Sequence, residues 1–90
     1  MLTIKFEKSF KKDYKLVVKR GYNIDLLEEI VGMLAAEESL PEKCKDHPLV
    51  ADYKGCRECH ITSDWLLIYR IQNEELILLL TRTGTHSDLF

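Results

Sequence analysis

The sequence predicts an α+β domain with the element order βααβββ, in which a helix hairpin packs on a mainly antiparallel, four-stranded sheet. Three patterns indicate this fold. The hydrophobic spacing changes from alternating to helical near the N-terminus, two helical patterns follow each other closely, and apolar runs dominate the C-terminal half. Ninety residues suffice for one modest core, so we expect a single domain spanning residues 1–90.

The N-terminal segment contains a strand pattern followed by an amphipathic helix pattern. Residues 2–6 alternate between apolar and polar side chains, which is typical of a strand with one buried face. From Glu7 onward, apolar side chains recur every three or four residues with lysines between them, as in a helix that buries one side. Gly21 can end this helix because glycine readily adopts the left-handed conformation of a C-terminal cap.

A second helix is expected directly after this glycine. Asn23 is a favourable N-terminal cap, and Ile24, Leu27, Val31 and Leu34 form an apolar stripe at helical spacing. Because only residues 21–23 connect the two helices, we expect an antiparallel helix hairpin.

Strands dominate the rest of the chain. Residues 41–53 form a connector with two prolines, and residues 54–61 are a plausible strand. Two strongly apolar runs, residues 65–71 and 75–83, are separated by a polar turn and predict a hairpin. The second run lacks polar alternation at 76–80, so this strand is expected at the sheet centre or covered on both faces.

Charge is distributed unevenly although the net charge is only −2. Residues 1–20 carry seven basic and two acidic side chains, giving +5, whereas residues 21–42 carry six acidic and no basic side chains, giving −6. The first helix therefore offers a basic face to a partner such as RNA, although a solvated helix surface explains the same pattern. No apolar stretch is long enough to cross a membrane and no signal peptide is visible, so a cytoplasmic protein is expected.

The motif Cys56-Arg-Glu-Cys59-His60 matches the attachment site of a c-type haem. In a strand, however, Cys56 and Cys59 point to opposite faces, whereas a haem needs both thiols on one side. The same geometry disfavours a redox dithiol, and a zinc site that adds Cys44 lacks a second paired spacing. We expect no haem, no metal and no other cofactor, with Cys59 in the core and Cys56 partly exposed.

The three histidines are dispersed in sequence but can converge in this fold. His60 lies near the end of one strand, just before a turn that leads to Asp64. The last strand runs antiparallel to the one before it, so its C-terminal end returns to the same edge with Arg82 and His86. If His47 in the connector folds over this edge, imidazoles, a carboxylate and a guanidinium gather in one acid–base site.

Four separated blocks of the sequence resemble the YafQ-type branch of the RelE/ParE toxin superfamily. They are residues 45–49 (Lys-Asp-His-Pro-Leu), 57–60 (Arg-Glu-Cys-His), 64–69 (Asp-Trp-Leu-Leu-Ile-Tyr) and 82–90 (Arg-Thr-Gly-Thr-His-Ser-Asp-Leu-Phe). The resemblance spans essentially the whole chain. It implies a RelE-like fold and the toxin of a type II toxin–antitoxin pair: an endoribonuclease that cleaves mRNA, typically in the ribosomal A site, and that a cognate antitoxin neutralises. The catalytic set it implies is His47, His60, Asp64 and His86, with Trp65 and Phe90 shaping the pocket.

A metal-free ribonuclease uses the 2′-hydroxyl of the RNA as nucleophile and needs a base, an acid and a cation. We expect His47 as base and His86 as acid, with the reverse assignment open. Asp64 would orient an imidazole, and His60 would hold the phosphate or assist proton transfer. The expected substrate contacts are Lys45, Arg57, Trp65, Arg82 and Phe90. Strand parity favours Arg82 over Arg57 as the phosphate ligand, and core packing is the alternative for both aromatic residues.

Three other functions stay open at the level of sequence, one of them a zinc-site protein that would use Cys44, Cys56, Cys59 and a histidine. A ParE-like gyrase poison would use the same scaffold without ribonuclease chemistry, and a non-catalytic binding module would use the histidines structurally. The three-histidine set favours the ribonuclease, since the rival activities need no acid–base pair.

Overall fold

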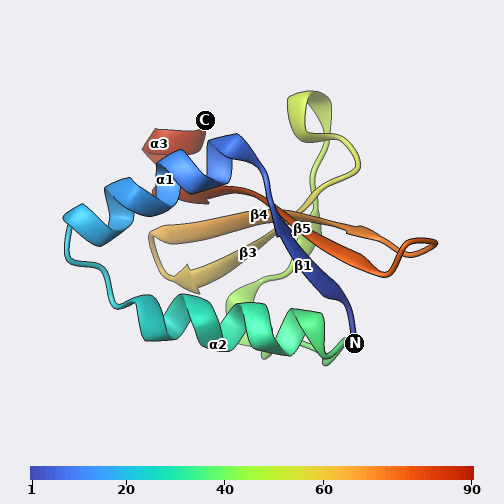
Figure 1. Cartoon of the computed structure of the whole chain (residues 1–90). Helices are drawn as coiled ribbons and strands as arrows, with labels where there is room; N and C mark the ends of the chain where they lie inside the picture. The colour runs from blue at the N-terminus through green and yellow to red at the C-terminus, as the bar shows by residue number, and fades with distance from the viewer.

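The computed structural model describes all residues from Met1 to Phe90 and confirms an α+β fold in which the six predicted elements follow one another in the expected order. A mixed sheet lies behind two long helices, and a short helix at the C-terminus packs beside the last strand (Figure 1). The helices are α1 (Lys8–Lys19), α2 (Ile24–Ala35) and α3 (His86–Leu89), with 3-10 turns at Glu42–Cys44 and Ala51–Tyr53. The strands are β1 (Thr3–Phe6), β2 (His47–Pro48), β3 (Arg57–Thr62), β4 (Trp65–Gln72) and β5 (Ile77–Gly84).

The sheet has five strands in the order β1-β5-β4-β3-β2, so the prediction of four strands was wrong. The additional strand, β2, has only two residues and lies in the connector, where the prolines hide any alternating pattern. β1 pairs with β5 in parallel and every other pair is antiparallel. The apolar run in β5 therefore lies inside the sheet, between β1 and β4, as its lack of alternation predicted.

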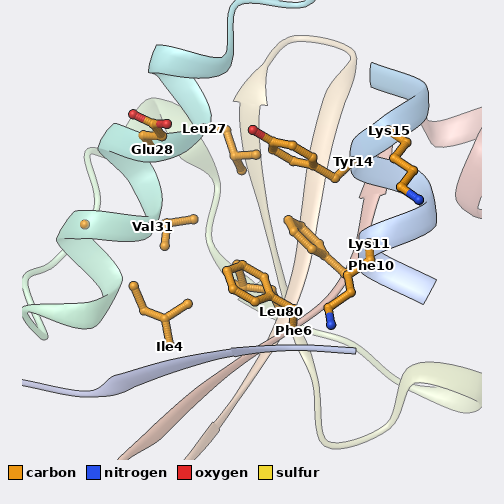
Figure 2. Close-up of a pocket in the computed structure, with 11 residues that line it drawn as sticks. Ile4, Phe6, Phe10, Lys11, Tyr14, Lys15, Leu27, Glu28, Val31 and Leu80 are labelled. Atoms are coloured by element: carbon orange, nitrogen blue, oxygen red, sulfur yellow. The ribbon is translucent and has the colours of Figure 1, made fainter. Parts of the chain in front are cut away.

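The first long helix begins and ends, and the second begins, where the sequence predicted, but the two do not form a packed hairpin. The Asn23 side chain accepts a hydrogen bond from the Asp25 backbone N–H, and Gly21 adopts φ 80°. α1 packs chiefly on β5 and α2 on β3, with few contacts between the helices. Between them lies an apolar groove of about 650 Å³ with Lys11 and Lys15 near the α1 side (Figure 2).

The sheet has a core on each face. The larger core fills the space between the helices and the sheet, and it includes Leu67 and Tyr69 of β4. The alternate residues Leu66 and Ile68 pack on the opposite face in a small cluster with Cys56 and Leu89. This second cluster decides the position of the C-terminal segment, because Leu89 belongs to α3.

α3 was not predicted as a helix. Four residues are too few to show a hydrophobic period, yet the local signals are present. Thr85 and Asp88 form a capping box, in which each side chain accepts a hydrogen bond from the other residue's backbone N–H. The helix begins at His86, one of the predicted site residues.

The three cysteines are free thiols, and all are buried. Cys59 lies in the larger core as predicted, and burial raises the pKa of its thiol far above the usual range. The prediction that Cys56 is partly exposed was wrong, because Leu66, Ile68 and Leu89 cover it. Cys56 and Cys59 lie in cores on opposite faces of the sheet, as strand parity indicated. No helix of the chain has both the length and the apolar character that a membrane crossing requires.

Truncating the fully buried Leu78 of β5 tests whether the central strand supports the fold. We expect Leu78→Ala to lower the free energy of unfolding by about 2–5 kcal/mol, because the cavity adds to the lost transfer energy. Urea unfolding followed by circular dichroism measures this loss. The same substitution at the exposed Leu76 in the preceding turn is the control and should change stability little. Similar losses in both variants would contradict this account of the core.

Candidate functional site

The most unusual polar group of the structure is Glu58, a carboxylate that is only 5% exposed. One oxygen lies 3.9 Å from Nε2 of His47 and the other lies 3.8 Å from Nε2 of His60. An isolated buried carboxylate is strongly destabilising, so its burial requires a compensating partner. Here two imidazoles flank it, and each can carry a positive charge opposite the carboxylate.

Sheet register explains why these three side chains meet. His47 of β2 pairs directly with Glu58 of β3, so the two side chains lie on the same face. His60 lies two residues beyond Glu58 and therefore points to that face as well. The prediction that the connector brings His47 to His60 is confirmed by this geometry, since both lie within 4 Å of the same carboxylate.

The His47 ring is held by its own backbone. Nδ1 lies 2.6 Å from the carbonyl oxygen of Lys45, which adopts a left-handed conformation with φ 49°. A carbonyl oxygen can only accept, so Nδ1 carries the hydrogen in this contact. In the neutral ring Nε2 is then free to accept a proton, and it faces Glu58. The backbone of Lys45 thus orients His47, while the substrate contact expected of its exposed side chain stays a prediction.

α3 brings the third histidine to the same face of the sheet. Glu58 and His60 pair across strands with Ile68 and Leu66, the residues against which Leu89 of α3 packs. The His86 ring stacks on Phe90 with ring centroids 4.9 Å apart. Phe90, 56% exposed, also meets Tyr53 edge-on, with ring centroids 5.6 Å apart. An exposed imidazole and an exposed aromatic ring thus lie at the end of the chain beside the face that carries Glu58.

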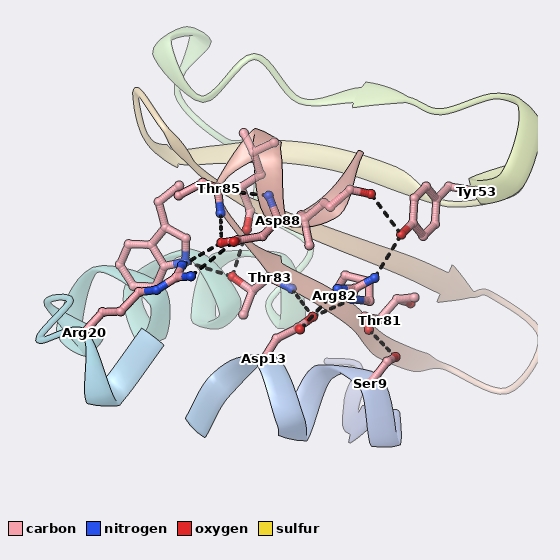
Figure 3. Close-up of polar contacts among 12 residues, drawn as sticks. Ser9, Asp13, Arg20, Tyr53, Thr81, Arg82, Thr83, Thr85 and Asp88 are labelled. Carbon is pink, nitrogen blue, oxygen red and sulfur yellow. Dashed lines mark hydrogen bonds and ion pairs between the residues drawn. The ribbon is translucent and has the colours of Figure 1, made fainter. Parts of the chain in front are cut away.

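Arg82 is already engaged in a hydrogen-bond network (Figure 3). Its Nε and Nη2 donate to the Asp13 carboxylate of α1 at 2.5 and 3.2 Å, and Nη1 donates to the Tyr53 hydroxyl at 3.2 Å. The hydrogen bonds to Asp13 raise the pKa of the guanidinium above its usual value, despite partial burial. Arg82 is therefore not a free cation, although Nη1 points to the side of the site where Tyr53 meets Phe90.

Arg57 and Arg82 lie on opposite faces, as strand parity predicted. Arg82 pairs with Ile68, whereas Arg57 pairs with Tyr69 on the face that the long helices cover. Arg57 donates to Asp46 at 3.2 Å, and the Tyr69 hydroxyl donates to the same carboxylate at 2.6 Å. Burial and this contact raise the pKa of the Tyr69 phenol above its usual range. Arg57 thus anchors the connector through Asp46 and lies away from the histidines.

Asp64 and Trp65 differ from their predicted places. Asp64 is exposed in the turn before β4, and no histidine hydrogen-bonds to it. It lines a separate cavity of about 260 Å³ beside Tyr22 and Trp65. Trp65 is 3% exposed, donates from Nε1 to the Thr83 hydroxyl at 2.8 Å and packs edge-on against Tyr22. The core-packing alternative therefore describes Trp65, and a stacking face for RNA is absent in this conformation.

Glu58 is the residue that sequence reasoning missed. Glu58 lies two residues before His60 in the same strand and so shares its face, but a glutamate in a strand ordinarily points to solvent. The missing signal was β2, because this two-residue strand pairs beside Glu58 and brings the second imidazole. In the structure it is the Glu58 carboxylate, and not that of Asp64, that lies beside the imidazoles of His47 and His60.

The arrangement is suited to proton transfer. It combines a ring nitrogen that can accept a proton, a buried carboxylate beside it, and a second exposed imidazole on α3. The chain has no group of three or more His, Cys, Asp and Glu side chains placed to hold a metal ion.

Comparison with known proteins identifies relatives over the full length. The family model described as the bacterial toxin of the type II toxin–antitoxin system, YafQ, matches residues 2–90. The "mRNA interferase toxin YafQ" of Escherichia coli BL21-DE3 is 39% identical over 88 residues, covering 97% of this chain and 94% of the relative. A metal-bound toxin from Helicobacter pylori superposes with a TM-score of 0.94 at 50% identity, with complete coverage of both chains. YafQ in the E. coli DinJ–YafQ complex gives a TM-score of 0.89 at 37% identity, covering 100% of this chain and 99% of that one.

Trp65 is the only tryptophan, so its fluorescence reports directly on its environment. We expect a blue-shifted emission with little acrylamide quenching, and no change when a single-stranded RNA oligonucleotide binds, because the indole is buried against Tyr22 and Thr83. Free tryptophan amide in the same buffer provides the exposed reference. Strong quenching on addition of RNA would show that Trp65 stacks on a base after all.

Proposed function

The chain belongs to the YafQ family of bacterial type II toxins, and on that premise we propose that it is an mRNA interferase. In this proposal it is a metal-independent endoribonuclease that cleaves mRNA in the ribosomal A site, in the cytoplasm, and a cognate antitoxin neutralises it. The observation that carries the proposal is the buried Glu58 between His47 and His60, on the face to which α3 brings His86.

His47 is the general base of the proposed reaction. Its Nδ1 hydrogen is committed to the Lys45 carbonyl, which leaves Nε2 to take the proton of the RNA 2′-hydroxyl. The imidazolium that forms faces the Glu58 carboxylate at 3.9 Å, so the protonated state gains an opposite charge.

His86 is the general acid, because it is exposed at the start of α3 and belongs to a different segment from the base. As the 2′-oxygen attacks phosphorus and the bond to the 5′-oxygen breaks, an imidazolium at His86 protonates the leaving oxygen. The products are an RNA end with a 2′,3′-cyclic phosphate and another with a 5′-hydroxyl. His60, also beside Glu58, is placed to hold the phosphate or to relay a proton.

Arg82 and Phe90 contact the substrate in this proposal. The Arg82 Nη1 now bonds to the Tyr53 hydroxyl, and a phosphate oxygen with negative charge is a stronger acceptor than a phenol. Phe90 exposes more than half its surface at the chain terminus, where a base can stack on it. Both residues lie beside Tyr53, so one nucleotide could meet both.

The proposed partners are an antitoxin and the ribosome with its mRNA. A relative is known in the DinJ–YafQ complex, which supports an antitoxin for this chain as well. The lysines of α1 lie on the outside of the fold and supply positive charge for ribosomal RNA, with affinity that should decrease as salt increases.

The direct test is cleavage of a defined mRNA on translating ribosomes. Purified protein should generate new 5′ ends at codons in the A site, and the new ends should carry 5′-hydroxyl and 2′,3′-cyclic phosphate or 3′-phosphate groups. Cleavage of the same mRNA without ribosomes would keep the ribonuclease and remove the ribosome from the proposal. No cleavage under either condition would contradict the proposed activity.

Substitutions at the three acid–base positions should separate chemistry from folding. We expect His47→Ala and His86→Ala each to lower the cleavage rate by about 10²-fold or more and to relieve growth arrest. Glu58→Gln, which keeps the shape but loses the charge, should lower the rate less. Ser87→Ala, beside His86 and exposed, is the control and should remain toxic. If both histidine variants stay fully toxic while folded, a gyrase poison on this scaffold becomes the better explanation.

A separate measurement tests whether RNA cleavage is independent of a bound metal ion. Protein stripped with EDTA and returned to ribosome buffer with Mg²⁺ should cleave at the same rate as untreated protein, because the imidazoles supply both proton transfers. Elemental analysis should find no stoichiometric zinc, copper or iron in the purified chain. A loss of activity that zinc or copper restores, but Mg²⁺ does not, would assign a metal to the reaction.

A further inference from the structure

Side chains on one side of α1, from its first turn to its C-terminal cap, form hydrogen bonds with the C-terminal segment of the chain (Figure 3). The Ser9 hydroxyl donates to the Thr81 carbonyl at 2.7 Å, Asp13 accepts from Arg82 and from the Thr83 backbone N–H, and Arg20 bonds to Asp88. With 3.6 residues per turn, positions separated by 4 and 11 residues fall on the same side of a helix. α1 therefore runs alongside the end of β5 and α3 as a support.

The last of these contacts is a bidentate ion pair. Arg20 Nη1 and Nη2 lie 2.6 and 3.1 Å from the two oxygens of Asp88. Asp88 Oδ2 also accepts the Thr85 backbone N–H at 2.9 Å, which closes the start of α3. These hydrogen bonds, first the one from Arg20, hold the pKa of the Asp88 carboxyl well below its usual range. The pair remains charged wherever the protein is folded at neutral pH.

The backbone before α3 is shaped to admit this carboxylate. Gly84 has φ 154°, a conformation that side chains disfavour, and a Cβ there would lie 2.9 Å from Asp88 Oδ2. The Asp88 side chain thus lies between Gly84 and Arg20 and is also bound to Thr85. A shift of Asp88 would move the whole short helix.

α3 cannot hold its position by itself. Four residues are far fewer than an isolated helix needs, and chain termini are ordered only where tertiary contacts anchor them. Its other anchors are Leu89 in the small cluster and a long hydrogen bond of 3.4 Å from the Tyr53 hydroxyl to the Leu89 carbonyl. Both act at the end of α3, whereas the Arg20–Asp88 pair acts together with the cap at its start, near His86.

We propose that Arg20 is a positioning residue for RNA cleavage, which by clamping Asp88 fixes α3 and so holds the His86 imidazole in its working place. This inference rests on the proposed function of His86 as the acid. Exposed ion pairs contribute little to global stability, so losing this one should loosen α3 without unfolding the domain. The expected signature is a slower chemical step in a protein of nearly unchanged stability.

The test compares three variants of the full chain. Arg20→Ala removes the clamp, and Arg20→Lys keeps the charge but not the planar fork that binds both carboxylate oxygens. Lys19→Ala removes the same charge from the same end of α1, and Lys19 has no ion pair. Cleavage is measured on mRNA-programmed ribosomes in single turnover, at protein concentrations that saturate the rate.

Arg20→Ala should lower the saturated rate at least tenfold, with Arg20→Lys between it and the wild type. Lys19→Ala should keep the wild-type saturated rate, because any loss of RNA affinity appears in the half-saturating concentration. The midpoint temperature of thermal unfolding should change little in all three variants. An Arg20→Ala variant that cleaves at the wild-type saturated rate would overturn the proposal, and so would an equal rate loss in Lys19→Ala.

NMR separates this inference from the proposed function. The His86 ring signals, assigned with His86→Ala, should shift and broaden in Arg20→Ala but not in Lys19→Ala, while the His60 signals stay in place. If the His86 signals of Arg20→Ala are unchanged, Arg20 does not position His86, and the proposal is overturned even if the wild type cleaves mRNA. If the His86 signals change in Arg20→Ala but the wild-type protein cleaves no RNA, the contact between Arg20 and Asp88 is only structural. Its proposed role in RNA cleavage is then overturned. If Arg20→Ala fails to fold, the rate and ring signals of Arg20→Lys decide in the same way.

Discussion

Strand β4 is buried on both faces, and the positions of the other elements follow from that constraint. Four consecutive residues, Leu66 to Tyr69, are almost fully inaccessible. Burial on both sides requires cover on both sides: the long helices supply it for Leu67 and Tyr69, and α3 helps to supply it for Leu66 and Ile68. The hydrophobic effect that builds the core therefore also draws the C-terminal end, with its histidine, onto the far face of the sheet.

The buried carboxylate of Glu58 is the feature that stability alone does not explain. Removing a carboxylate from water costs several kcal/mol in proteins, and an apolar residue at this place would avoid that cost. Two imidazoles lie within 4 Å of this carboxylate, and each is a group that can carry the opposite charge.

The candidate site is assembled from the parts of the chain with the least structure of their own. His47 comes from a two-residue strand, and His86 comes from a four-residue helix at the terminus. Neither segment has enough local hydrogen bonding to be ordered alone. The Lys45 carbonyl, the Asp46 contacts and the α1 side chains provide the missing anchors from outside the site. Residues outside the candidate site therefore decide whether His47 and His86 are in place.

The sequence by itself determined the α+β class, the order of the main elements, the Asn23 cap, the left-handed Gly21 and the opposite faces of Cys56 and Cys59. These features follow from local preferences and from periods of 2 and 3.6, which the chain carries wherever it folds. The family blocks likewise identified the histidines as the residues to examine. The convergence of His47 and His60 was also foreseeable, given a connector that folds back.

Tertiary structure alone decided the fifth strand, the divergence of the long helices, the role of Glu58 and the core position of Trp65. Each depends on contacts between residues far apart in sequence, for which no local period exists. Glu58 is buried because β2 pairs beside it, and Trp65 is buried because Tyr22 and Thr83 lie against it. The sequence suggested that Arg82 is a free cation. In the fold it donates a hydrogen bond to Asp13, which lies 69 residues earlier in the chain. Burial and charge pairing are properties of the assembled surfaces, so a residue's chemistry could be read from its type while its partner could not.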